Sequence, residues 1–154
     1  MSALMVIRAQ ADTPEVAAVL QRHFDLMRAS SPAESCHVME PDTLLEHDAV
    51  LFAVRDGDAV LGVGAMTVID PSHGELKSMH TVAEARGRGV ARAVLRALLD
   101  YSVAQGFDRV SLETGSADLF APARALYRAH GFRSCPPFGD YAEDPLSVFM
   151  TRTL

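Results

Sequence analysis

Long hydrophobic runs are absent from this sequence of 154 residues. A membrane-spanning helix needs ~20 mostly apolar residues, and no apolar run here approaches ~18. The N-terminal residues also lack the charged-then-apolar pattern of a secretory signal. We therefore expect no membrane partner and a cytoplasmic location. The length suits one domain with a substantial core and is short for two, so residues 1–154 are predicted to form a single domain.

Cysteine is scarce as well, with only Cys36 and Cys135. Neither lies in a CxxC pair or in a Cys/His spacing typical of metal sites. We therefore expect two free thiols and no metal centre.

Basic residues are the minority among the charged groups. Lys and Arg total 14 against 20 Asp and Glu, which gives a net charge of -6. The overall field does not favour nucleic acid or an anionic membrane surface, so no nucleic-acid partner is expected. Any basic site must be local.

One local basic segment does occur, between a strand-like run (residues 75–82) and an apolar-periodic run (90–105). It consists of Arg86, Gly87, Arg88, Gly89, Val90, Ala91 and Arg92. A glycine loop that opens into a helix gathers unpaired N–H groups and the positive end of the helix dipole, which favours phosphate. Three arginines add charged donors suited to a polyphosphate. A glycine-rich turn beside a solvated helix end is the alternative.

Two nucleotide motifs do not fit this segment. A Walker loop needs Gly-Lys-Ser/Thr, and no lysine follows these glycines. A dinucleotide fingerprint needs a third glycine where this sequence has Arg92.

Hydrophobic periodicity predicts a mixed α/β sheet flanked by helices. Expected strands cover residues 3–9, 49–54, 59–69, 75–82, 108–114, a short run from 132, and 146–153. Expected helices begin at Pro14, cover 43–47 and 90–105, and run from Pro122 to His130. Asp56-Gly57 predicts a hairpin, and Gly62 and Gly64 predict a bulge or close packing in the following strand.

The order of these elements, with two motifs, resembles the GCN5-related N-acetyltransferase (GNAT) superfamily, bacterial small-molecule type. Arg86, Gly89 and Ala91 match its pyrophosphate motif, Arg/Gln-x-x-Gly-x-Gly/Ala, and residues 126–132 match Leu-Tyr-x-x-x-Gly-Phe. The resemblance covers nearly the whole chain. It implies a mostly antiparallel sheet that splays between the fourth and fifth strands, and it implies use of acetyl-CoA.

The resemblance also implies which residues contact the cofactor. The strand before the loop would bind the pantetheine arm as an added strand would, and the loop backbone would hold the pyrophosphate. The implied contacts are Met79, His80, Thr81, Arg86, Gly87, Arg88, Gly89, Val90, Ala91, Arg92 and Tyr127. Phe120 stands where many members have an asparagine that contacts the cofactor. Residues 29–41 either line the acceptor site or form a plain connecting loop.

Acetyl transfer to an amine calls for a base, because an alkyl ammonium with pKa ~10.4 is mostly charged at neutral pH. Glu75 is the first candidate for this base. The alternative is that Glu75 is simply an exposed carboxylate at the start of a strand. Glu113 is the second; it either acts as the base, binds a cationic acceptor, or pairs with Arg109 or Lys77. His80 ranks third, because alternation turns it away from Met79.

Tyr127 occupies the position of the family's tyrosine that protonates the leaving thiolate, or else packs in the core. A strand N–H near Thr81 would stabilise the oxyanion.

We therefore expect an acetyl-CoA-dependent N-acetyltransferase acting on a primary amine of a small-molecule or amino-acid-like acceptor. Two alternatives stay open: acetylation of protein N-termini or lysines, and a non-catalytic acyl-CoA sensor. Family members often dimerise, so a homodimer is also open.

Overall fold

The structure, a computed structural model, describes residues 4–32, 43–44 and 49–154. Its strands are β1 (Met5–Ala9), β2 (Val50–Asp56), β3 (Ala59–Asp70), β4 (His73–Thr81), β5 (Arg109–Gly115), β6 (Arg133–Ser134) and β7 (Ser147–Thr153). The helices are α1 (Pro14–Ser30), α3 (Val90–Ala104) and α4 (Ala121–Ala129). The seven predicted strands and the three longer predicted helices are therefore present, with ends that differ by about two residues or fewer. Two predicted segments are described only in part. The predicted helix over 43–47 is described only at residues 43–44, and residues 33–41 of the candidate acceptor stretch 29–41, with Cys36, lie outside the described residues.

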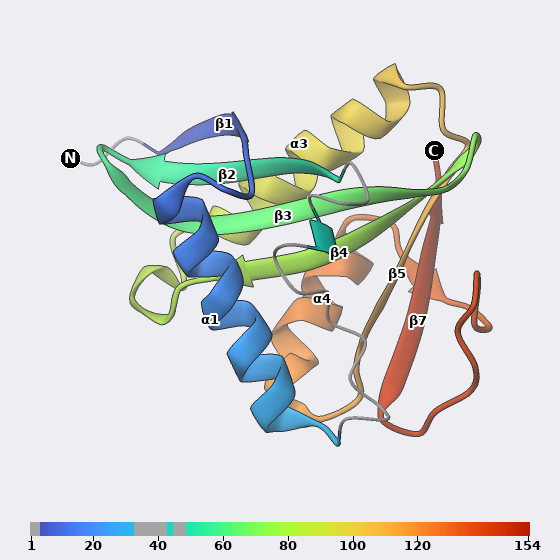
Figure 1. Cartoon of the computed structure of the whole chain (residues 1–154). Helices are drawn as coiled ribbons and strands as arrows, with labels where there is room; N and C mark the ends of the chain where they lie inside the picture. Colours follow the sequence, from blue (N-terminus) through green and yellow to red (C-terminus); the bar gives the residue numbers. More distant parts are fainter. Residues whose placement is uncertain (1–3, 33–42, 45–48) are drawn as a thin grey trace.

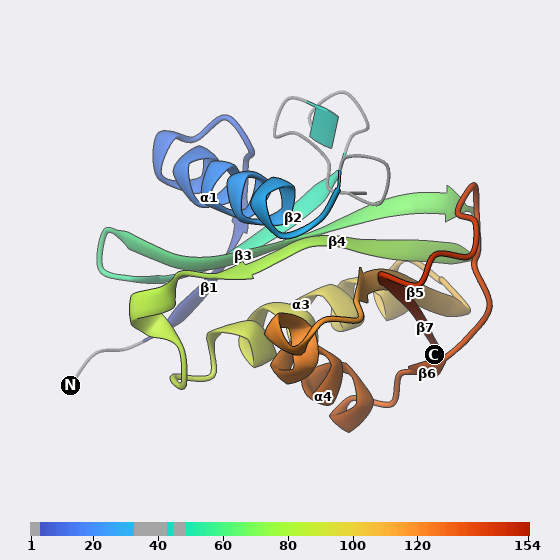
Figure 2. The same cartoon turned by 90° about the horizontal axis from the view of Figure 1, so that it is seen from below.

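The strands form a single seven-stranded sheet in the order β1-β2-β3-β4-β5-β7-β6. Neighbouring strands run antiparallel except for β4 and β5, which are parallel. Helix α1 covers one face of this sheet, and α3 and α4 cover the other (Figures 1 and 2). The mixed, mostly antiparallel sheet predicted from the sequence is thus confirmed.

Helix boundaries follow from local chemistry. Pro14 and Pro122 lie in the first turn of α1 and α4, where their missing N–H costs nothing. Gly106 follows α3 at φ 81°, a left-handed conformation that glycine adopts without strain. On α3, Val94, Leu95 and Leu98 are almost fully buried, and each contributes roughly 1.5–3 kcal/mol through burial.

One strand begins earlier than predicted. The sequence predicted a strand from residue 75, but β4 already begins at His73, which pairs with Asp70 and with Arg109. The Asp70 carboxylate accepts a hydrogen bond from the Ser72 backbone N–H at 2.8 Å and closes the turn early.

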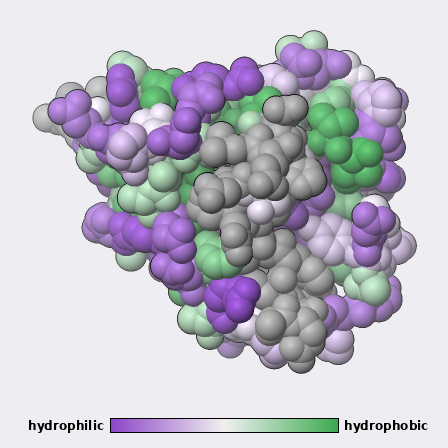
Figure 3. Space-filling view, in the orientation of Figure 1, coloured by the Kyte–Doolittle hydropathy of each residue, from purple (hydrophilic) through white to green (hydrophobic). Residues whose placement is uncertain are grey.

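The viewer's face in Figure 3 is hydrophilic along much of its margin, with hydrophobic side chains in small separate groups. Large exposed hydrophobic side chains are spread over several elements, namely Met5, Val6, Val68, Val103, Leu119 and Leu146. Within the described ranges, no helix combines the length and apolarity that crossing a bilayer requires.

The glycines of β3 allow α3 to pack closely on the sheet, as predicted. A Cβ on Gly62 would overlap Val90 Cγ1 and lie 3.0 Å from the His80 carbonyl oxygen, which is backbone and cannot move aside. A Cβ on Gly64 would overlap the Met79 sulfur. The start of α3 is thereby held against β3.

We predict that Gly62→Ala lowers the free energy of unfolding by about 1–3 kcal/mol, because the added methyl overpacks this contact. Gly57→Asn is the matched control: Gly57 lies in the β2–β3 turn at φ 60° with nothing within 4 Å of a Cβ, and asparagine tolerates that conformation. Urea unfolding followed by circular dichroism measures both. Equal losses in the two variants would contradict the packing explanation.

Candidate active site

Strands β4 and β5 separate part-way along their length. Their ladder ends at Leu76 and Leu112, although β4 continues to Thr81 and β5 to Gly115. The register between β3 and β4 shifts by one residue just beyond this point, and Ser78 has a φ of 56°. These are the features of a β-bulge, which bends a strand away from its neighbour. The splay predicted from the family resemblance is confirmed.

The glycine loop lies at the end of β4 that leads into α3. Gly87 and Gly89 have φ values of 83° and 81°, and nothing lies within 4 Å of a Cβ at either position. Glycine is favoured there by backbone conformation rather than by crowding. Gly89 directly precedes the first turn of α3, so the unpaired N–H groups of that turn lie beside the loop.

A cavity of about 680 Å³ joins the loop to the splay. It is lined by residues of α1, β4, α3, β5 and α4, and by Tyr141 and Leu146 of the segment before β7. It brings together nearly all of the predicted site residues: Glu75, Met79, His80, Thr81, Arg86, Gly87, Gly89, Val90, Ala91, Arg92, Glu113 and Tyr127. Arg88 is not among the lining residues, and its guanidinium pairs with Asp56 at 3.0 Å.

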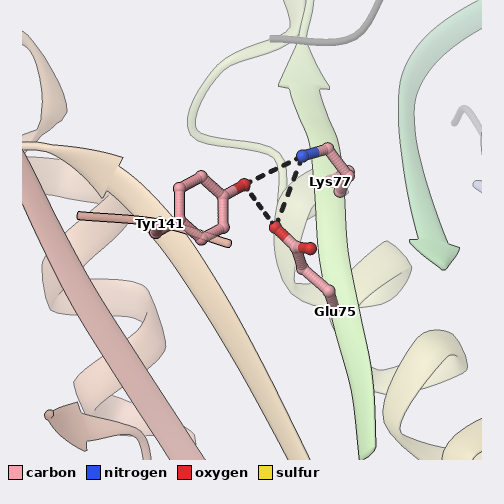
Figure 4. Close-up of polar contacts among 3 residues, drawn as sticks. All are labelled: Glu75, Lys77 and Tyr141. Carbon is pink, nitrogen blue, oxygen red and sulfur yellow. Dashed lines mark hydrogen bonds and ion pairs between the residues drawn. The ribbon is translucent and has the colours of Figure 1, made fainter. Parts of the chain in front are cut away.

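Three polar side chains meet on the wall formed by β4 (Figure 4). Glu75 Oε2 accepts hydrogen bonds from the Tyr141 hydroxyl at 2.6 Å and from Lys77 Nζ at 3.3 Å. Lys77 Nζ also donates to the Tyr141 hydroxyl at 3.0 Å. The side chains of Glu75 and Lys77 are each 12% exposed. We call Glu75, Lys77 and Tyr141 the polar triad.

The sequence indicated only part of the triad. Glu75 and Lys77 are two residues apart on a strand, so alternation places both on one face. Lys77 was considered as a partner of Glu113, but its ammonium bonds to Glu75 and Tyr141 instead. Tyr141 is 66 residues from Glu75 along the chain, and no local pattern predicts that contact.

An aromatic cluster holds Tyr141 in place. Its ring packs edge-on to Phe138 at 5.2 Å between centroids and against Phe149 of β7 at 5.4 Å. Phe138 in turn packs on His73, whose Nε2 lies 2.6 Å from the Ser111 hydroxyl. The segment between β6 and β7 is therefore anchored to the sheet beside the cavity.

Glu113 is the second carboxylate on the cavity wall. Burial raises its pKa to about 7, although the nearby Ser147 side chain and the charge of Lys77 oppose the change. The negative charges of Glu75 and Asp144 add to the rise. Ser111 pairs with Glu75 across β4 and β5, so Glu113, two residues further along, projects to the same face of the sheet. At neutral pH this carboxyl is poised between its two protonation states.

Comparisons with known proteins agree with this geometry. The family model described as the acetyltransferase (GNAT) family matches residues 16–132. This chain belongs to the GNAT acetyltransferase family. It is 41% identical over 140 residues to a protein of Bacillus subtilis named as the uncharacterized N-acetyltransferase YsnE, covering 91% of this chain and 93% of that protein. As a member of this family with such relatives, the chain is an acetyltransferase.

Solved structures show the same fold. An acyl-CoA N-acyltransferase of Klebsiella pneumoniae superimposes with a TM-score of 0.79 at 24% identity, covering 98% of this chain and 97% of the other. A GNAT family acetyltransferase from Elizabethkingia anophelis with acetyl-CoA bound has a TM-score of 0.72 at 16% identity, covering 98% of both chains.

Two histidines of this acetyltransferase meet at the end of the cavity beneath α1. His23 of α1 is buried, and its Nδ1 lies 3.2 Å from Nδ1 of His80. The rings pack edge-on at 5.2 Å. Met79, by contrast, packs towards Gly64 and α3, so the expected opposite orientations of Met79 and His80 are confirmed. Both histidines are neutral at pH 7, and with two facing Nδ1 atoms one ring donates and the other accepts.

Tyr127 and Phe120 define the α4 side of the GNAT cavity. Tyr127 is 5% exposed, packs edge-on to Phe132, and has a pKa raised by burial above the usual value for tyrosine. The ring of Phe120 lies so close to Gly115 that any Cβ there would overlap it. Phe120 therefore places an apolar ring, rather than an amide, on the wall at the end of β5.

The buried histidine pair predicts a loss of stability in acid. Burial is the main cause that lowers the pKa of His23 to about 3, and the charge of His80 lowers it further. Burial is also the main cause that lowers the pKa of His80 to about 4; the charges of Arg22 and Arg86 lower it further, and that of Glu84 opposes them. The unfolded chain, with histidine pKa ~6.5, therefore binds more protons below that pH, and stability falls as pH falls. For His23 alone the loss reaches about 2 kcal/mol at pH 5.

The check is urea unfolding at pH 7, 6 and 5, for the wild type and for His23→Leu. We expect a shallower decline in the variant. The pKa of Glu113 is raised on folding, so its contribution to stability increases as the pH falls. This contribution is the same in both proteins and does not affect the comparison. Parallel declines would show that His23 does not contribute.

Proposed function

We propose that this acetyltransferase uses acetyl-CoA to acetylate a primary amine of a small-molecule or amino-acid-like acceptor, by direct attack of the amine on the thioester. One observation carries the proposal: a single cavity has a phosphate-type glycine loop at one end and a carboxyl with pKa about 7 on its wall, joined by an open strand edge.

The residues present fit acetyl-CoA. The N–H groups of residues 87–92, with Arg86 and Arg92, would hold the pyrophosphate at the start of α3. The edge of β4 beyond Leu76 would hydrogen-bond the amides of the pantetheine arm, as a sheet edge binds an added strand. When bound there, acetyl-CoA supplies an activated acetyl group. A backbone N–H near Thr81 would stabilise the developing oxyanion.

Glu113 is our proposed general base. A base is most effective when its pKa lies near the working pH, and Glu113 meets that condition. Glu75, the first candidate from the sequence, has Oε2 engaged by Tyr141 and Lys77, so we assign it to orienting the triad. Glu113 would take a proton from the ammonium of the acceptor, and the neutral amine would then attack.

Tyr127 is our proposed acid. Its raised pKa keeps the phenol protonated throughout the neutral range. A thiol has a pKa of ~8.5, so Tyr127 can at least stabilise the departing sulfur by hydrogen bonding. The new bond joins nitrogen to the acetyl carbon, the carbon–sulfur bond breaks, and the thiolate gains a proton.

The first experiment measures free-thiol release from acetyl-CoA across a panel of amines, amino acids and peptides. We expect release that depends on the acceptor, with kcat/KM rising as pH increases through about 7, because Glu113 must lose its proton. Glu113→Gln should remove this limb of the pH profile and lower kcat roughly 10²–10⁴-fold. Glu143→Gln, at an exposed position, is the control and should change neither. If instead Glu75→Gln removes the limb and Glu113→Gln keeps it, Glu75 is the base.

A second prediction concerns Tyr127→Phe. Since only the hydroxyl is removed, we expect kcat to fall by at least ~10-fold while coenzyme A affinity, measured by calorimetry, stays within about 3-fold. Unchanged kcat would leave Tyr127 as a packing residue. Tight coenzyme A binding without release for any acceptor would favour the sensor alternative.

A further inference from the structure

Lys77 is the only lysine among the 14 basic residues of the sequence, and it lies in the wall of the cavity. Its side chain is 12% exposed. An ammonium withdrawn from water to this extent is costly unless hydrogen-bonded partners compensate. The partners of its three N–H donors therefore show whether this cost is fully compensated within the protein.

The triad leaves this ammonium only partly satisfied. Its distance to Glu75 Oε2 is 3.3 Å, longer than the ~2.7–2.9 Å typical of a charged hydrogen bond. The short contact to Glu75, at 2.6 Å, comes from the Tyr141 hydroxyl instead. Within the part of the chain that the structure describes, Glu75 and Tyr141 account for two of the three donors of Lys77. One donor remains for a ligand in the cavity.

Glu113 supplies the complementary charge on the same face. Lys77 is close enough to lower the pKa of Glu113 through its charge, and both residues line the cavity. An acceptor whose amine lies at Glu113 would thus have a cation within reach for its own negative group. A polyamine would instead bring a second positive charge towards Lys77, and a peptide N-terminus carries no carboxylate beside its amine.

We propose that Lys77 binds a carboxylate of the acceptor, so that the preferred acceptors carry an amine and a carboxylate on neighbouring carbons, as α-amino acids do. Tyr141 and Glu75 hold Lys77 in position, and Glu113 receives the amine. This inference rests on the proposed function, because it assumes acetyl transfer to an amine in this cavity.

The test combines a change in the acceptor with a change in the protein. Free L-leucine, L-methionine and L-phenylalanine are each compared with their α-amides, which lack the negative charge. An α-amine next to an amide has a pKa of only ~8, so a larger neutral fraction favours the amide on intrinsic reactivity. We expect the wild type to prefer the acids nonetheless, by at least ~10-fold in kcat/KM.

Lys77→Met should reduce that ratio to about 1 or below, while Arg128→Met, at an exposed position outside the cavity, should leave it unchanged. Because Lys77→Met leaves the Glu75 carboxylate without its cation, the double variant Glu75→Gln/Lys77→Met removes both charges and serves if the single variant does not fold. Calorimetry of the free amino acids with coenzyme A present gives an independent reading: their affinity should fall at least ~10-fold in the Lys77 variants.

Each outcome has a distinct meaning. A wild type that uses amides, polyamines or peptides as well as free amino acids would refute the role of Lys77 and leave the acetyltransferase proposal intact. A preference for the free amino acids over their α-amides that persists in both Lys77 variants would also refute the role of Lys77 and leave the acetyltransferase proposal intact. Failure of every acceptor, with coenzyme A still bound, would instead count against the proposed function itself.

Discussion

The separation of β4 from β5 is the constraint on which the site depends. Parallel strands normally pair along their common length, yet this ladder ends at Leu76 and Leu112. The bulge at Ser78 turns β4 aside, at the expense of a positive φ on a residue other than glycine. An open strand edge would be a liability on a protein surface. Here it faces a cavity, where a ligand with amide groups can pair with it.

The bulge also determines which side chains meet the ligand. Beyond it, Met79 turns towards α3 and His80 towards α1, so adjacent residues contribute to opposite layers. Before it, Glu75 and Lys77 lie on the face that carries Glu113. The phosphate end is fixed independently, because Gly62 lets Val90 and the start of α3 pack against β3. The distance between the two ends is thus determined by the sheet rather than by loops.

Much of this arrangement could be predicted from the sequence, because it is encoded locally. Helix starts at proline, the Asp56-Gly57 hairpin and the Arg-Gly loop depend on a few adjacent residues, and the motif spacing identified the fold. What could not be predicted depends on contacts between distant segments. Tyr141 reaches Glu75 only because Phe138 and Phe149 pack its ring, and His23 is buried only because α1 lies over His80.

The two carboxylates of the cavity show how tertiary context separates chemically similar groups. From the sequence, Glu75 and Glu113 are both acidic residues on neighbouring strands, and position alone ranks Glu75 first. In the structure, Tyr141 and Lys77 both bond to Glu75, whereas burial dominates at Glu113 and raises its pKa to about 7. Two carboxylates with different surroundings can divide the work of orientation and proton transfer.

Because Lys77 also acts on Glu113 through its charge, an anion bound at Lys77 would weaken that effect and raise the pKa of Glu113 further. The ammonium of the same acceptor would act in the opposite sense, so a zwitterion would leave the base near its poised state, whereas a simple cationic amine would drive it towards the ionised form.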